Sequence, residues 1–225
     1  LGWQSVGSIT LGAYDGNPPP MYGRLPQSQS LWINKGFKNP GVVEAKRRLE
    51  EQTFSVPVGM SIGATNRKYS STKELIEEYV QAFLIAKSLK TLAYFELNIS
   101  CPNLHTKIDW SEPKLLKKLL TSIDACAVKK PILIKMPIDI SQATLIKMLT
   151  IIRQHNIAGI ILGNLTKQRN NPAIWKSELI TIPANGGFSG KPTQAQGEQL
   201  IRCAYRHSGK ELIIIGCGGI FTAQD

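Results

Sequence analysis

The chain of 225 residues lacks an apolar run of the length that crosses a membrane, and it has few side chains that bind metal ions. Its four cysteines and three histidines are widely spaced and form no Cys-x-x-Cys pair. These residues are Cys101, Cys126, Cys203, Cys217, His105, His155 and His207. The spacing excludes a disulfide framework and a zinc site, so we expect no metal and a reducing, cytoplasmic setting.

Acidic residues are scarce relative to basic ones, 16 against 27, which gives a formal net charge of +11. Such an excess is typical of nucleic-acid binding or of contact with an anionic membrane surface. Here the lysines are interleaved with apolar positions, which indicates solvated helix faces. The composition, 42% hydrophobic and 19% charged, is that of an ordered globular protein, and we expect no nucleic-acid partner.

Short apolar runs rich in branched residues alternate with helical patterns, which is the signature of β-α-β units and a parallel sheet. The predicted strands cover residues 6–10, 56–62, 94–99, 131–136, 157–162 and 212–216. Helix signals lie between them. Ser71 and Glu74 form a capping box, and Pro113 suits a first turn. Ser141 suits an N-cap, and the pattern over 194–206 stops near Gly209.

Polar and glycine residues gather directly after the predicted strands, as expected where the loops of a barrel form an active face. They are Ser8, Ser61, 98–103, Lys135, Gly163, Asn164 and 216–219. Six strands with covering helices fit either an open doubly wound sheet or a (β/α)8 TIM barrel without two of its strands, and these loops favour the barrel. Two insertions, residues 11–46 and 165–194, exceed a plain connection and suit a lid.

The run 95–103, Phe-Glu-Leu-Asn-Ile-Ser-Cys-Pro-Asn, ends an apolar strand with two amides and a thiol around Pro102. Asn98 and Asn103 are paired donors and acceptors for a planar, amide-rich ligand, and Cys101 lies close enough in sequence to move a proton. The alternative is a buried strand end with an inert cysteine. Burial of two amides favours the functional interpretation.

Two further strand ends suit an anionic ligand. Lys135 follows an apolar strand and offers a fixed cation, although such a lysine also extends into solvent in many strands. The run Gly216-Cys217-Gly218-Gly219 offers bare backbone N–H groups to a phosphate, although a glycine cluster alone is also a tight turn.

Six collinear segments together resemble the dihydroorotate dehydrogenase family. They are Gly7-Ser8-Ile9-Thr10; Asp15-Gly16-Asn17-Pro18-Pro19-Pro20 with Arg24-Leu25-Pro26; 98–103; Ile134-Lys135-Met136-Pro137; Gly187-Phe188-Ser189-Gly190-Lys191-Pro192; and Ile215-Gly216-Cys217-Gly218-Gly219. They span nearly the whole chain. The resemblance implies a TIM barrel with FMN at its carboxyl-end face, which oxidises (S)-dihydroorotate to orotate in pyrimidine (UMP) biosynthesis.

The resemblance also implies residue roles. Cys101 is the base that removes a proton from C5 of dihydroorotate, and Lys135 is the cation beside the flavin ring. The cofactor-binding residues would be Gly7, Ser8, Ser61, Asn98, Lys135, Gly163, Ser189, Gly190, Gly218 and Gly219. The substrate-binding residues would be Asn34, Asn98, Asn103, Asn164 and Thr166. The reference pKa of a thiol, ~8.5, predicts faster turnover at alkaline pH.

The electron acceptor is left open between quinone, fumarate and NAD, with quinone favoured. A cysteine base is typical of the family's soluble members, whereas the segment 187–192 and Arg169 are typical of its membrane-associated, quinone-reducing members. Peripheral contact with the inner face of the cell membrane and homodimer formation are also left open. We expect residues 1–225 to be one FMN-binding barrel domain without the N-terminal first strand and the C-terminal eighth strand.

Two alternatives compete with this assignment. A tRNA-dihydrouridine synthase is also an FMN barrel with an Asn-x-x-Cys-Pro loop, and the net charge of +11 suits it. Asn103 and the Gly16-Asn17-Pro18 segment argue against it. The second alternative is an incomplete, non-catalytic barrel, suggested by the missing strands and by Leu165 where the family has a small hydroxyl residue.

Overall fold

The computed structural model describes residues 2–101, 103–105, 108–208 and 210–225. Six parallel strands form the main sheet in the order β1-β4-β5-β6-β7-β9. Their bounds are Gln4–Ile9, Val58–Ile62, Tyr94–Asn98, Ile132–Lys135, Gly159–Leu162 and Ile213–Gly216. Each parallel strand lies beside the one before it in the chain, with no reversal of order. This succession is that of a partial (β/α)8 barrel, so the predicted fold class and all six predicted strands are confirmed.

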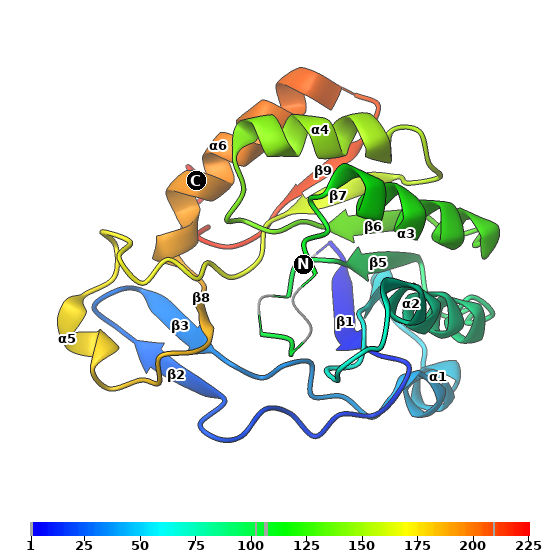
Figure 1. Ribbon diagram of the computed structural model, residues 1–225, viewed down its shortest axis with the longest axis horizontal. Helices are drawn as coiled ribbons and strands as arrows, with labels where there is room; N and C mark the ends of the chain where they lie inside the picture. Colours follow the sequence, from blue (N-terminus) through cyan, green and yellow to red (C-terminus); the bar gives the residue numbers. More distant parts are fainter. Residues whose placement is uncertain (1, 102, 106–107, 209) are drawn as a thin grey trace.

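The helices cover the outer face of this sheet, and each packs beside the next (Figure 1). They are α1 (Val42–Glu50), α2 (Thr72–Ala86), α3 (Pro113–Ala125), α4 (Gln142–Ile152) and α6 (Lys191–Ser208). The main core fills the space between helices and strands, with Phe83, Phe95, Leu116, Ile134 and Met148 fully buried. None of the helices in the described ranges is long and apolar enough to span a bilayer.

The structure agrees with the predicted helix starts except in two details, the partner of Glu74 at α2 and the first residue of α6. The hydroxyl oxygen of Ser71 accepts from the backbone N–H of Glu74 at 3.1 Å, and Ser141 caps α4 in the same way through Thr144 at 3.0 Å. The Glu74 carboxylate, however, accepts from the backbone N–H of Ser70 rather than from that of Ser71, so the capping box closes one residue early. Helix α6 begins at Lys191, three residues before the predicted start, and Gly209 lies outside the described residues.

The two insertions combine into one small lobe. Strands β2 (Tyr22–Leu25) and β3 (Ser30–Ile33) come from the first insertion, and β8 (Gly187–Phe188) comes from the second. They form an antiparallel sheet in the order β2-β3-β8, beside the short helix α5 (Lys176–Leu179) (Figure 1). Leu25, Trp32, Ile174 and Phe188 make its separate core. The small lobe therefore joins two distant parts of the chain, and the segment 33–38 that leaves it lies near the carboxyl ends of the parallel strands.

Alternation along the strands decides which side chains face the barrel interior. On β5, Phe95 and Leu97 pack toward the helices, so Tyr94, Glu96 and Asn98 face inward. Strand register then places Asn98 beside Lys135 on β6. Inward-facing polar residues near the strand ends thus meet in one place.

Candidate active site

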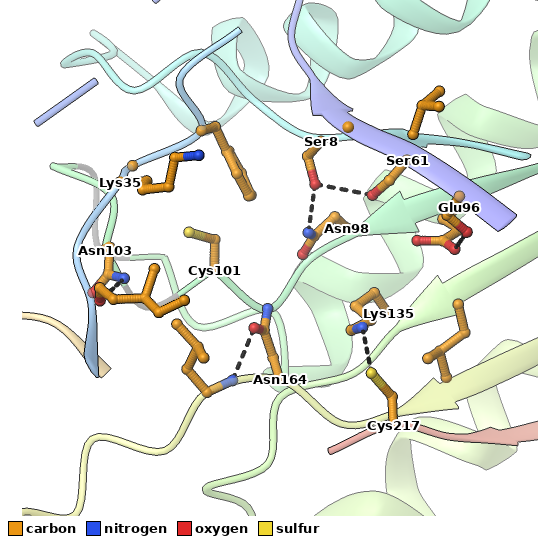
Figure 2. A pocket seen from close by; sticks show the side chains of 18 of the residues that line it. Ser8, Lys35, Ser61, Glu96, Asn98, Cys101, Asn103, Lys135, Asn164 and Cys217 are labelled. Carbon is orange, nitrogen blue, oxygen red and sulfur yellow. Dashed lines mark hydrogen bonds between the residues drawn. The ribbon is translucent and has the colours of Figure 1, made fainter. Parts of the chain in front are cut away.

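A cavity of about 570 Å³ opens at the carboxyl ends of the parallel strands, a size typical of cofactor sites. Its lining residues come from all six parallel strands, from the loops after β5, β7 and β9, and from the segment 33–38 that leaves the small lobe. Those predicted as site residues are Gly7, Ser8, Ser61, Asn98, Cys101, Asn103, Lys135 and Asn164. Figure 2 shows these polar side chains around one space. The structure therefore gathers most of the predicted site from distant parts of the sequence.

A hydrogen-bonded row fixes one wall of the cavity. The Asn98 amide Nδ2 donates to Ser8 Oγ at 2.8 Å, and Ser8 Oγ lies 2.9 Å from Ser61 Oγ. Asn98 Oδ1 accepts from the backbone N–H and the hydroxyl of Ser100, both at 3.1 Å. Gly7 adopts a φ of 115°, and a Cβ there would lie 2.6 Å from Ser61 O. Only glycine fits this close approach, so the wall offers backbone as well as side-chain groups to a ligand.

Lys135 ends β6 and points into the same cavity (Figure 2). Its Nζ lies 3.4 Å from the Sγ of Cys217, which follows β9 and also lines the cavity. Register places Lys135 between Asn98 on one side and Ile161 on the other. The strand pairing and the contact with Cys217 thus fix the Lys135 ammonium beside Asn98, where a planar ligand in the cavity would contact it.

Cys101 lines the opposite wall, between Asn98 and Asn103 (Figure 2). Burial raises the pKa of its thiol to about 11, while the backbone of Asn103 and the positive charge of Lys167 act in the other direction. The thiol is therefore protonated at neutral pH in this cavity. Pro102, the centre of the predicted motif, lies outside the described residues.

Asn103 carries an unsatisfied polar atom. Its Nδ2 donates to the carbonyl of Ile33 at 3.0 Å, whereas its buried Oδ1 has no partner among the described residues. A buried acceptor without a donor is costly, and a ligand N–H group would satisfy it. Asn103 also lines a neighbouring cavity of about 420 Å³, together with Asn34. The Asn34 side chain accepts from Asn17 Nδ2 at 3.0 Å, so Asn34 lies behind Asn103 and outside the main cavity.

The two predicted substrate residues after β7 lie differently. Asn164 lines the cavity, and its Nδ2 donates to Ser100 Oγ at 2.8 Å. The hydroxyl of Thr166 instead donates to Asp139 at 2.6 Å, and its backbone pairs with Phe188. Thr166 is buried and does not line the main cavity, where Leu165 takes that place.

Four of the remaining predicted cofactor residues, Ser189, Gly190, Gly218 and Gly219, lie at the N-terminus of α6 and not on the main cavity wall. Gly218 and Gly219 pack so closely on the first turn of α6 that a Cβ at Gly219 would lie 2.7 Å from Gln194 Cα. Ser189 and Gly190 directly precede the helix, and Gly163 donates its N–H to the carbonyl of Cys217 at 3.0 Å. Glycine N–H groups beside a helix N-terminus suit a phosphate.

Several lining residues were not predicted as part of the site, among them Cys217, Lys35, Phe37 and Glu96. Cys217 was considered only as part of a glycine run, and no pattern in the sequence indicates its contact with Lys135. Lys35 and Phe37 reach the cavity from the loop after β3, which requires the fold of the small lobe. Glu96, in contrast, is two residues before Asn98 on β5, a spacing that could have indicated its place on the same inward face.

Comparison with known protein sequences points to one family. A family model described as Dihydroorotate dehydrogenase matches residues 1–225. Proteins named "Dihydroorotate dehydrogenase (quinone)" from Mycobacterium sp. (strain KMS) and Acaryochloris marina (strain MBIC 11017) are 33% and 31% identical over 100% of this chain and 61% of their own length. The chain thus spans about three fifths of these relatives.

Solved structures share the fold. A crystal structure of DHODH from Eimeria tenella in complex with ferulenol gives a TM-score of 0.82 at 20% sequence identity. The match covers 99% of this chain and 64% of that one. A ligand-free structure from the same organism gives 0.81 at 21% identity, over 97% of this chain and 66% of that one.

Proposed function

Because the chain belongs to the dihydroorotate dehydrogenase family, we propose that the protein oxidises (S)-dihydroorotate to orotate with FMN in pyrimidine biosynthesis and passes the electrons to a quinone. The observation that carries this proposal is the meeting of Asn98, Cys101 and Lys135 around one cavity at the strand ends. Residues 1–225 would be one barrel domain. Strands β1 and β9 are the edges of its sheet, and strands outside this chain would close the barrel.

The cavity fits FMN by volume, by the chemistry of its walls and by a separate phosphate-type cradle. Gly7, Ser8, Ser61 and Asn98 would hold the flavin ring, and Lys135 would lie where negative charge accumulates on reduction. Ser189, Gly190, Gly218 and Gly219 would bind the phosphate at the start of α6, and Gly163 would line the flavin. FMN supplies the acceptor for the hydride that leaves C6 of dihydroorotate.

Cys101 would remove the proton from C5, and the asparagines would orient the ring. The unsatisfied Oδ1 of Asn103 would accept a ring N–H, and Asn164 and Asn98 offer further amide groups on the same cavity. Asn34 would not touch the substrate. It would position Asn17, whose side-chain amide also donates to the backbone carbonyl of Asn103. Thr166 would position the loop after β7 through Asp139 rather than touch the substrate in this conformation.

A quinone could approach along the outer face of the small lobe. Ile33 lines the cavity, and Leu31 lies on the same face of β3. Across from them on β2 are Tyr22, which is 70% exposed, and Arg24. This apolar strip with one cation suits a ring that carries two carbonyl oxygens. Fumarate and NAD remain the alternative acceptors, and peripheral membrane contact and a homodimer remain part of the proposal.

The test uses the full-length protein with its natural flavin content. We expect a flavin absorbance spectrum that orotate perturbs, and reoxidation of the reduced flavin by a soluble quinone faster than by fumarate or NAD. A flavin spectrum that does not respond to orotate would instead support the tRNA-dihydrouridine synthase alternative. Absence of flavin would support the non-catalytic barrel and contradict the proposal.

A further inference from the structure

Glu96 is an inward-facing carboxylate that the proposed reaction does not use. It is the middle residue of β5 and is only 7% exposed, yet it lines the cavity two residues before Asn98. Its Oε1 accepts from the hydroxyl of Ser5 on β1, and Ser5 Oγ also lies 2.6 Å from the Tyr94 hydroxyl. Within the described parts of the chain, its second oxygen has no hydrogen-bond partner.

Burial of a carboxylate without a neighbouring cation costs free energy, because the charge loses its hydration. No ion pair joins Glu96 to any of the described residues. Strand register identifies the cation nearest to it along the inward face. Glu96 pairs with Leu133 on β6, and Lys135 is two residues further along that strand. Strand geometry puts the Cα atoms of Glu96 and Lys135 roughly 8 Å apart.

The two charges therefore act on one another within the cavity. Figure 2 shows both side chains entering it from neighbouring strands, with Lys135 directed toward Cys217. A unit charge at this separation in a protein interior changes the energy of a second charge enough to alter an equilibrium by about one order of magnitude. Attraction by the Glu96 carboxylate thus draws the Lys135 ammonium away from a ligand in the cavity and weakens the contact that the ammonium makes with it.

We propose that Glu96 is a positioning residue that acts through Lys135: its carboxylate attracts the ammonium from one layer below and limits how strongly the cavity favours reduced over oxidised flavin. This inference rests on the proposed FMN site. It assigns to Glu96 a role that neither proton transfer nor substrate binding requires.

The experiment measures the affinity of the full-length protein for oxidised FMN relative to reduced FMN, obtained from the midpoint potentials of bound and free flavin. Glu96→Gln keeps the shape and the acceptor for Ser5 but removes the charge. We expect it to shift the affinity ratio toward reduced FMN by about tenfold. Glu198→Gln is the matched control, because Glu198 is exposed on α6 and the same change there should shift the ratio by less than about twofold.

A double-mutant cycle tests whether the effect runs through Lys135. In the Lys135→Met background, Glu96→Gln should shift the ratio by less than about twofold. An equal shift in both backgrounds would overturn the inference, because the carboxylate would then act on the flavin directly. The inference would also be overturned if Glu96→Gln shifted the affinity ratio by no more than Glu198→Gln does. If the Gln variant does not fold, Glu96→Met replaces it with the same expectation.

Failure of the proposed function would look different. A wild-type protein that binds no FMN in either oxidation state would contradict the flavin site itself and, with it, the role of Glu96. A wild-type protein that binds FMN and responds to orotate, but whose affinity ratio does not depend on Glu96, would contradict only the inference about Glu96.

Discussion

The main sheet and the small lobe build the two sides of the cavity by different means. The six parallel strands place Asn98 and Lys135 by local alternation and by the pairing of consecutive strands. The small lobe brings Ile33 and the 35–38 segment to the cavity by pairing β3 with β8, which follows more than 150 residues later. The first region places polar side chains at the carboxyl ends of parallel strands, and the second supplies residues to another side of the cavity.

The largest effect should come from the strand-end region, at Cys101. Cys101→Ala should slow reduction of the flavin by dihydroorotate by roughly 10²- to 10⁴-fold, the usual contribution of a positioned proton-transfer group, while FMN and orotate affinities stay nearly unchanged. Stopped-flow absorbance of the full-length protein measures the rate. Reduction within a few-fold of the wild-type rate would make Cys101 a structural residue.

The pH profile sharpens the same prediction. Burial favours the neutral thiol and raises the pKa of Cys101 to about 11, so the reactive thiolate is a minor species at neutral pH. The wild-type rate should therefore rise about tenfold per pH unit through the range below that pKa. Cys101→Ser should keep some activity but require higher pH, since a hydroxyl is a weaker acid. A flat profile in the wild type would contradict the assignment.

Lys135→Ala should have the next largest effect. Removal of one preorganised charge should slow flavin reduction by about two orders of magnitude or release most of the FMN. Lys129→Ala is the control, because Lys129 is exposed ahead of the same strand and should retain both properties. Reduction at the wild-type rate with full flavin content would contradict the role of Lys135.

In the small lobe, Trp32→Ala should cause local unfolding. Trp32 is fully buried against Phe188, and its Nε1 donates to Asn185 O at 2.6 Å. Truncation of a buried Trp lowers the free energy of unfolding by about 3–5 kcal/mol. We expect the core of the small lobe, which has few buried residues, not to tolerate that loss. Limited proteolysis should then cut the 20–34 and 165–188 segments while the main sheet resists. Trp175→Ala, at a side chain that is 59% exposed, should leave the cleavage pattern unchanged.

The smallest effect should be at Glu178, which joins the two insertions. Desolvation pushes the pKa of Glu178 upward, but hydrogen bonds from the Ser28 hydroxyl and the backbone N–H groups of Gln27 and Ser28 outweigh it and hold the pKa below its usual range. A lowered pKa stabilises the folded lobe above the unfolded-state pKa, and this contribution disappears as the pH falls through the folded-state value. Proteolysis of the lobe should accelerate in acid, and Glu178→Gln should abolish that acid dependence.

The strand ends were predictable because consecutive parallel strands share one edge, so polar residues that follow buried runs must meet there. Asn98, Cys101, Lys135 and Asn164 follow from that rule. The small lobe was not predictable in detail, since the pairing of β3 with β8 depends on a contact between two distant insertions. For the same reason, the sequence did not indicate that Thr166 binds Asp139 or that Asn34 lies behind Asn103.

The most direct test of the central claim is anaerobic mixing of the full-length, FMN-loaded protein with (S)-dihydroorotate, followed by flavin absorbance. The account predicts that the absorbance of oxidised flavin disappears in a single turnover and that orotate forms in equal amount. Unchanged absorbance in a protein that binds both FMN and orotate would contradict the assignment of this cavity as a dihydroorotate oxidation site.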